Sequence, residues 1–380
     1  QIDAWRKQWL MSELKELAPN PSKTEEAHSL IEITRSQEAR GVSGAQSQPQ
    51  PPRSPMDRFL DNLPATARFC VLVLCVFVFF GAHNYLQEGI TRMEGFEGLG
   101  SMLGYLEVVG VTVCSFVERR VAGETKRTVS VFNYMRLTLC LMGTSYLSTV
   151  GLNYINYPTK VVFRSCKLIP TMIVALFINH ETFSIGEISS AVAVCIGLVL
   201  FAFADMAGDS KVSTPLGLSL QAASVVADAF LPNLQQALFK QGASTLEVTF
   251  FTNLYVFFIM TALGAGTGQL QGVSRFVLGS VEGALSLLAY TVVAYVAISF
   301  HMRVVSRYGS VVAVLVGNLR KAGTIVLSFL VFPKPFSLSY VYGTLLVLGG
   351  LTTYAQAKES RRRNRHPSPP PHGSSSAAAG

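Results

Sequence analysis

Charged residues are scarce in this sequence. Only 14% of its 380 residues are Asp, Glu, Lys or Arg, whereas 49% are hydrophobic and the mean hydropathy is +0.37. Ordinary soluble domains carry about 25% charged residues, so the composition argues against such a domain and favours a chain embedded in a lipid bilayer. The formal net charge of +8 does not predict a nucleic-acid partner, because the basic residues lie beside or within apolar segments.

Recognisable catalytic and metal-binding patterns are also lacking. The sequence has no G-x-x-x-x-G-K-[ST] element, which argues against direct drive by ATP hydrolysis. None of the six histidines belongs to a metal-binding or triad pattern, and the six cysteines fall inside apolar segments without a C-x-x-C pair. We therefore expect no enzymatic activity, no cofactor and no bound metal.

Long apolar segments, in contrast, recur through most of the chain. A helix needs about 20 mostly apolar residues to cross the hydrocarbon core of a bilayer. Such segments are predicted at 69–88, 98–117, 130–150, 158–178, 186–206, 215–238, 246–266, 281–301, 310–332 and 336–357. The sequence therefore predicts an all-α, polytopic membrane protein of about ten spans. A cleavable signal peptide is not expected, because a long polar segment precedes the first span.

The two ends of the chain differ from this membrane domain, which we place at residues 66–358. Residues 1–65 are polar and include a Gly-, Ser-, Gln- and Pro-rich tract, which predicts a disordered cytosolic tail. Residues 359–380 are basic and then low in complexity, which predicts a second cytosolic tail.

Basic residues in the loops divide unevenly between the two sides of the membrane. With both termini in the cytosol, the basic residues assigned to the outer side are only Arg92, Lys211, Arg275 and Lys334, and those of the other loops and the tails face inward. Cytosolic loops carry an excess of Lys and Arg. The asymmetry therefore predicts an even number of spans with both termini cytosolic.

The fourth and ninth predicted spans are similar to each other. Arg164 and Lys167 lie inside the apolar fourth span, and Arg320 and Lys321 lie inside the ninth. Each span is the fourth helix of a half that has about five helices, and an odd number places the two halves in opposite orientations. The sequence thus predicts two inverted repeats, at about 66–206 and 215–357, with a substrate site near the midplane between them.

The basic residues of the fourth span share one helix face, because Lys160, Arg164 and Lys167 are spaced i, i+4 and i+7. At 1.5 Å per residue, Lys167 and Lys321 lie about 14 Å and 16 Å inside their spans. Charged side chains at that depth are costly and mark functional positions.

Two explanations for these cations are open. They are paired with intramembrane acids, for which the candidates are Glu88, Glu107 and Asp228, or they form an anion-binding site. We favour the anion site, because a surplus of positive charge remains even if every acid is paired. The cations counted here are Lys160, Arg164, Lys167, Arg320 and Lys321.

Proline and tyrosine residues in the spans suggest further features. Pro170 removes the hydrogen bond to the carbonyl of Cys166 and predicts a kink that opens the helix toward a cavity, unless it is merely tolerated there. Tyr290 and Tyr295 are candidates for stacking on a nucleobase, and their alternative role is packing.

Four stretches carry a resemblance to a known family. They are Tyr85-Leu86-Gln87-Glu88, Asn156-Tyr157-Pro158-Thr159-Lys160 running into Cys166-Lys167-Leu168-Ile169-Pro170, Ala227-Asp228-Ala229 with Asn233 and Gln235, and Arg320-Lys321-Ala322-Gly323-Thr324. Over about residues 69–357, the chain resembles nucleotide-sugar transporters of the drug/metabolite transporter superfamily. It is most similar to the branch that carries 3′-phosphoadenosine 5′-phosphosulfate (PAPS).

The first stretch is shared with carriers of UDP-sugars, whereas the Cys-Lys-Leu-Ile-Pro and Arg-Lys-Ala-x-Thr elements resemble the PAPS branch. Residue chemistry and resemblance together select the candidate substrate-binding residues Lys160, Arg164, Lys167, Arg320, Lys321, Thr324, Tyr85, Gln87, Glu88, Tyr157, Asp228, Asn233, Tyr290 and Tyr295.

The resemblance implies import of PAPS from the cytosol into the lumen of the Golgi, or of the endoplasmic reticulum. It also implies exchange for an adenosine nucleotide such as adenosine 3′,5′-bisphosphate. The negative charges of PAPS agree with the cationic surplus. A UDP-sugar carrier on the same fold is the main alternative. A membrane protein that does not transport is disfavoured by the missing catalytic pattern and by the repeat, and homo-oligomerisation is left open.

Overall fold

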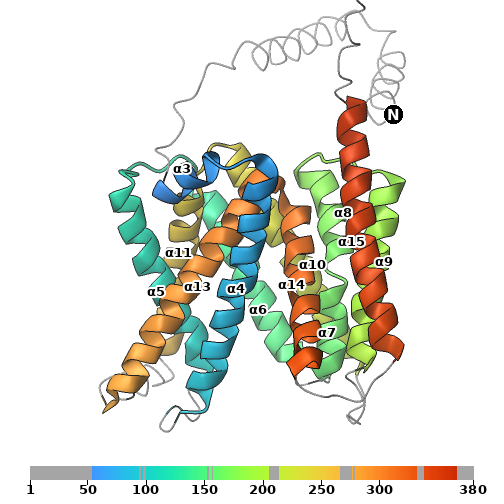
Figure 1. Ribbon diagram of the computed structural model, residues 1–380. Helices are drawn as coiled ribbons and strands as arrows, with labels where there is room; N and C mark the ends of the chain where they lie inside the picture. The colour runs from blue at the N-terminus through green and yellow to red at the C-terminus, as the bar shows by residue number, and fades with distance from the viewer. Residues whose placement is uncertain are drawn as a thin grey trace, which may run out of the picture. The chain divides into compact units, whose positions relative to one another are not determined.

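The computed structural model describes residues 54–93, 96, 100–151, 154, 155, 157–204, 214–265, 276, 279–331 and 338–365. Every regular element of at least seven residues in this part of the chain is an α-helix, so the predicted all-α class is confirmed. The longer helices run alongside one another (Figure 1).

The helix boundaries follow the predicted spans closely. In chain order the helices are α3 (Pro55–Asp61), α4 (Ala65–Thr91), α5 (Gly100–Val121), α6 (Val131–Gly151), α7 (Tyr157–Ser165), α8 (Leu168–Ile178), α9 (Ile185–Ala204), α10 (Pro215–Lys240), α11 (Thr245–Ala265), α13 (Val281–Tyr308), α14 (Ser310–Val331) and α15 (Leu338–Arg365). Among the described residues, α4, α11 and α13 are long and apolar enough to cross a bilayer. The largest extensions past a predicted end are those of α13, which continues to Tyr308, and α15, which continues to Arg365.

Residues 55–61, which the sequence assigns to the tail, form the short helix α3. Ser54 caps it by accepting a hydrogen bond from the backbone N–H of Asp57 at 3.2 Å, and Pro55 occupies the first helical position. Leu60 is fully buried against side chains of α4 and α13. Packing onto the bundle therefore supports a helix that has no long apolar segment of its own.

Local capping sets the starts of several longer helices. At α9, the backbone N–H of Ser184 donates to Glu187 (2.8 Å) and the N–H of Glu187 donates to the Ser184 hydroxyl (3.2 Å), which is a capping box. At α11, the Ser244 hydroxyl accepts from the N–H of Glu247 at 2.9 Å. These polar groups satisfy helix ends that have no intrahelical partner.

The long helices pack in defined pairs. α4 contacts α13, α6 contacts α10, α5 contacts both α11 and α13, and α9 lies beside α15 (Figure 1). The last pair is close because small residues face each other: a Cβ atom at Gly197 would lie only 2.8 Å from the carbonyl oxygen of Gly343. Close approach through small residues is a common way to pack helices in membranes.

The fourth predicted span is interrupted, and α7 ends at Ser165 before α8 begins at Leu168. Pro170 has no N–H to donate to the carbonyl of Cys166, and that carbonyl instead accepts from Ile169 at 3.2 Å. The break lies one turn before Pro170, at the position where the sequence predicted a kink. It places Lys167 at the N-terminal cap position of α8.

Candidate functional site

A cavity of about 910 Å³ lies among α5, α6, α7, α10, α11, α13 and α14. Binding sites for small molecules typically measure about 300–1,000 Å³, so the cavity has room for a nucleotide-sized ligand. The charged side chains in its described wall are Glu107, Arg164, Lys167, Asp228 and Arg320, and His301 lies beside them. Three of these five charged groups are cations.

Two of the cations have no carboxylate partner in the part of the chain that the structure describes. Within the described residues, neither Arg164 nor Arg320 forms an ion pair, and the guanidinium of Arg320 lies 5.0 Å from the ring centroid of Phe80. An aromatic face stabilises a cation but does not neutralise it. A guanidinium inside a membrane domain therefore needs water or a mobile anion.

The third cation is paired. The Nζ atom of Lys167 lies 2.8 Å from a carboxylate oxygen of Asp228, and each side chain is 19% exposed. Asp228 was one of the acids proposed from the sequence as a pairing partner, so for Lys167 the structural explanation applies. The described wall keeps a positive surplus, because Arg164 and Arg320 together outweigh Glu107.

Glu107 is held by two aromatic side chains. The hydroxyl of Tyr290 donates to Glu107 at 3.1 Å, and Nε2 of His83 lies 3.5 Å from the same oxygen. The ring of Tyr290 is buried and stacks on His83 with centroids 4.6 Å apart. In this arrangement Tyr290 contacts Glu107 without lining the cavity, and His83 covers one face of the Tyr290 ring.

The Tyr-Leu-Gln-Glu stretch of α4 does not line the cavity. The side chain of Tyr85 is 79% exposed, and Gln87 and Glu88 are exposed as well. Glu88 forms an ion pair with Arg92 on the surface of the same helix. These three candidate residues therefore lie apart from the basic residues in the cavity wall.

Asn233 and Tyr295 connect helices rather than line the cavity. Asn233 is fully buried, donates to the carbonyl of Thr171 at 3.0 Å and accepts from the hydroxyl of Ser310 at 2.6 Å. The hydroxyl of Tyr295 donates to Glu118. Both side chains use their polar groups within the protein.

The remaining candidates belong to the basic helices. Lys160 is half-buried in α7 and does not line the cavity. Tyr157, Lys321 and Thr324 lie in α7 and α14, but their side chains are outside the described part of the structure. Their roles stay predictions.

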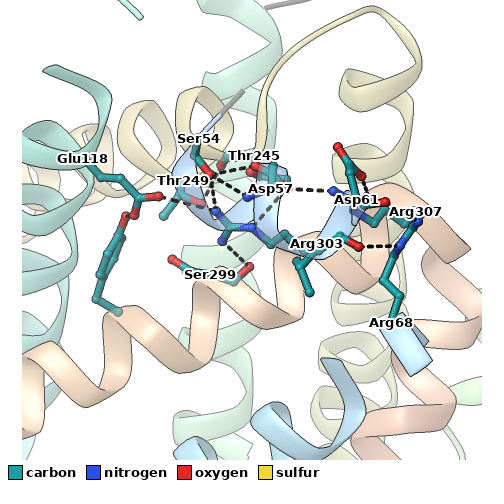
Figure 2. A network of polar contacts seen from close by, with 12 residues as sticks. Ser54, Asp57, Asp61, Arg68, Glu118, Thr245, Thr249, Ser299, Arg303 and Arg307 are labelled. Atoms are coloured by element: carbon teal, nitrogen blue, oxygen red, sulfur yellow. Dashed lines mark hydrogen bonds and ion pairs between the residues drawn. The ribbon is translucent and has the colours of Figure 1, made fainter. Parts of the chain in front are cut away.

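A second polar cluster lies where α3 meets α5 and α13, and the sequence did not predict it. Arg303, only 1% exposed, reaches from α13 to Asp57 (Nε to Oδ1, 3.2 Å) and to Glu118 (Nη2 to Oε1, 3.4 Å), as Figure 2 shows. Arg307 contacts Asp57 at 3.0 Å and Asp61 at 2.6 Å. These ion pairs tie α3 and α5 to the end of α13.

Neighbouring loops are joined to this end of the bundle in the same way. Glu247 at the start of α11 accepts from the N–H of Thr128 and from the hydroxyl of Tyr134, each at 2.6 Å. Glu124, in the loop after α5, accepts from the hydroxyl of Ser244 at 2.6 Å, and burial raises the pKa of its carboxyl above the ordinary value. Polar contacts therefore close the end of the bundle that bears α3.

The sequence contained a signal for this cluster. Asp57 and Asp61 are spaced i, i+4, and so are Arg303 and Arg307, which places each pair on one helix face. Opposite charges with matching spacing are complementary when two helices meet. The positive-inside argument counted the two arginines only as residues on the cytosolic side.

Among the described residues, no group of three or more His, Cys, Asp or Glu side chains is placed to hold a metal ion. A separate groove of about 650 Å³ lies between α4, α14 and α15 and is lined mainly by apolar side chains such as Val73 and Leu351. The larger cavity with its basic wall is therefore the candidate site for a charged ligand.

Comparison with known sequences gives one family match. The sequence profile of the UAA transporter family matches residues 68–358, which include most of α4, every described helix from α5 to α14 and most of α15. The match covers the cavity and its basic residues.

Curated relatives agree with this match, and one solved structure has a similar fold. The human and mouse proteins named adenosine 3′-phospho 5′-phosphosulfate transporter 2 are each 32% identical over 77% of this chain, which corresponds to 73% and 79% of their own lengths. The Drosophila melanogaster protein of the same name is 29% identical over 78% of both chains. One crystal structure aligns with a TM-score of 0.54 at 12% identity, over 76% of this chain and 97% of its own, and shows a similar fold.

Proposed function

Because the chain belongs to the UAA transporter family, we propose that it transports PAPS from the cytosol into the lumen of the Golgi. The names of the relatives indicate the substrate, and the charges of the site give a physical reason for it. PAPS carries phosphate and sulfate groups, and guanidinium groups bind such oxyanions through strong, charge-assisted hydrogen bonds.

One observation carries the proposal. Arg164 and Arg320 face a common cavity from α7 and α14, and neither has a carboxylate partner among the described residues. In an ion pair that serves only structure, the protein supplies both the cation and the anion. In an anion-binding site, the protein supplies the cations and the ligand supplies the negative charge. A multiply charged nucleotide supplies the missing negative charge.

The proposed binding residues follow from this geometry. Arg164 and Arg320 contact the phosphate and sulfate groups. Lys167, which is paired with Asp228, helps to position these groups. We add Lys321, Thr324 and Tyr157 from the same two helices, since they lie near these arginines in the sequence, and leave out Lys160, which does not line the cavity. Tyr85, Gln87, Glu88, Asn233, Tyr290 and Tyr295 are not included, because they lie outside the cavity wall.

The proposed architecture has ten spans in two inverted halves, with α7 and α8 forming one span. Helix packing supports it. If the helices of the two halves correspond one to one in chain order, the contact of α4 with α13 has its counterpart in the contact of α10 with α6. Both contacts occur. The contact of α5 with α13 likewise corresponds to that of α11 with α6. Both termini are cytosolic in this arrangement, and import proceeds by exchange with an adenosine nucleotide.

Uptake by the purified protein in liposomes tests this function. Vesicles loaded with adenosine 3′,5′-bisphosphate should take up labelled PAPS faster than empty vesicles, and UDP-galactose should not compete. Uptake of UDP-galactose or UDP-N-acetylglucosamine without uptake of PAPS would replace the proposal by a UDP-sugar carrier on the same fold.

A further inference from the structure

A histidine and a carboxylate from different helices meet at the edge of the cavity. His83 of α4 is only 8% exposed, and its Nε2 atom lies 3.5 Å from the Oε2 atom of Glu107 on α5. The hydroxyl of Tyr290 on α13 donates to the same oxygen at 3.1 Å, and its ring stacks on the imidazole. Glu107 itself lines the cavity.

This cluster lacks hydrogen bonds that it needs. Within the described residues, neither ring nitrogen of His83 has a hydrogen-bond partner. A neutral imidazole has one N–H donor and one acceptor nitrogen, and buried polar atoms are rarely left without a partner. When His83 gains a proton, both ring nitrogens become donors, and the contact with Glu107 becomes an ion pair.

The surroundings of the cluster are positively charged. The ring of Phe80 lies edge-on to the rings of His83 and His301, with centroid distances of 6.5 Å and 6.2 Å. The guanidinium of Arg320 lies over the same Phe80 ring. The other titratable or charged groups in the described cavity wall are Tyr146, Arg164, Lys167, Asp228, His301 and Arg320. With neutral histidines, the described part of the wall has three cationic and two anionic side chains, and one added proton raises the net charge of this part from one to two.

We propose that the pair of His83 and Glu107 binds a proton together with the substrate anion, so that transport of the anion is coupled to a proton. The inference rests on the proposed function, because it requires an anion in the cavity. Without the proton, Glu107 repels phosphate and sulfate groups that lie beside Arg320. With it, the pair is neutral and the cationic wall attracts them.

Linked binding makes this coupling reciprocal. If the proton tightens binding of the anion, the anion tightens binding of the proton by the same factor. Anion binding therefore takes up a proton from solution, and affinity rises as the pH falls. Coupling free energies between sites commonly correspond to about fivefold or more in affinity.

Calorimetric titration of the purified full chain with PAPS tests the coupling. Between about pH 8 and pH 5.5, where histidine ordinarily titrates, the wild-type Kd should fall at least about fivefold. Titrations in two buffers with different ionisation enthalpies report the protons taken up. PAPS titrates in this range too, so the readout is the difference between wild type and Glu107→Gln, which should show a flatter pH profile and lower proton uptake.

Matched variants separate the site from general effects. Glu282→Gln removes an exposed carboxylate at the start of α13 and should keep the wild-type profile. His83→Asn should behave like Glu107→Gln and replaces it if that variant does not fold. In liposomes, an inward proton gradient should accelerate PAPS uptake by wild type and leave uptake by Glu107→Gln unchanged.

Equal pH profiles and equal proton uptake in wild type and Glu107→Gln overturn the inference while leaving PAPS transport intact. If wild type binds no PAPS at any pH, the proposed function fails, and the same titrations with UDP-galactose decide the coupling. Failure to bind either anion overturns both.

Discussion

Two pairs of arginine side chains within the described helices differ in their partners. Arg303 and Arg307, at the end that bears α3, each contact two carboxylates. Arg164 and Arg320, in the cavity wall, contact none among the described residues. Removing a charge from water is costly unless a partner is present. The first group finds its anionic partners within the protein, whereas the second requires water or a bound anion.

Lys167 lies between these two cases, because it lines the cavity like the second group and is paired like the first. The comparison teaches that location in the cavity does not by itself make a cation a ligand-binding residue. A paired cation should affect the stability of the empty protein, whereas an unpaired one should affect the response to ligand. The predictions test this division.

Arg303→Met should have the largest effect. It leaves Glu118 and Asp57 without their most buried cationic partner, and breaking a buried ion pair costs about 3–5 kcal/mol. Unfolding of the purified protein without ligand should show this loss. As a control, Arg92→Met removes a 75% exposed member of a surface pair and should change stability by less than about 1 kcal/mol. Equal stability of the two variants would show that the α3 cluster is not structural.

Lys167→Met should destabilise the empty protein by a smaller amount, about 2–3 kcal/mol, because Asp228 is left unpaired but keeps some contact with the cavity. The double variant Lys167→Met, Asp228→Leu should recover most of that loss, since no unpaired charge remains. Thermal unfolding of both variants checks the prediction. A double variant no more stable than the single one contradicts it.

Arg320→Ala should weaken PAPS binding without changing the stability of the empty protein. Hydrogen bonds to charged groups contribute about 1.5–3 kcal/mol, which corresponds to a loss of roughly 10- to 150-fold in affinity. Lys321→Ala should likewise remove transport without unfolding. Ligand-induced thermal shift and liposome uptake are measured on the same preparations, and normal uptake of PAPS by a variant excludes that residue from the site.

Asp57→Asn should have the smallest effect of the series. The change keeps the size of the side chain, and Arg303 and Arg307 retain Glu118 and Asp61 as partners. The expected loss is about 1–2 kcal/mol in unfolding of the empty protein, with PAPS affinity unchanged. A change in PAPS affinity as large as that of Arg320→Ala would erase the distinction between the two groups.

The positions of the long helices could be predicted because each apolar segment forms its own backbone hydrogen bonds, as a helix in a bilayer must. Helix α3 could not be, since its stability depends on Leu60 and on ion pairs with Arg303 and Arg307, which are distant in the sequence. The break before α8 was predictable from Pro170, because a missing N–H acts locally.

For the site, the sequence by itself determined which helices carry buried cations, since a charge in an apolar segment is visible without a fold. The tertiary structure decided which cations are paired: Lys167 with Asp228, Arg303 with Asp57 and Glu118, and Arg164 and Arg320 with no acid among the described residues. It also brought His83 to Glu107. Pairing depends on distances of a few ångströms between helices far apart along the chain, and only the packing of those helices sets such distances.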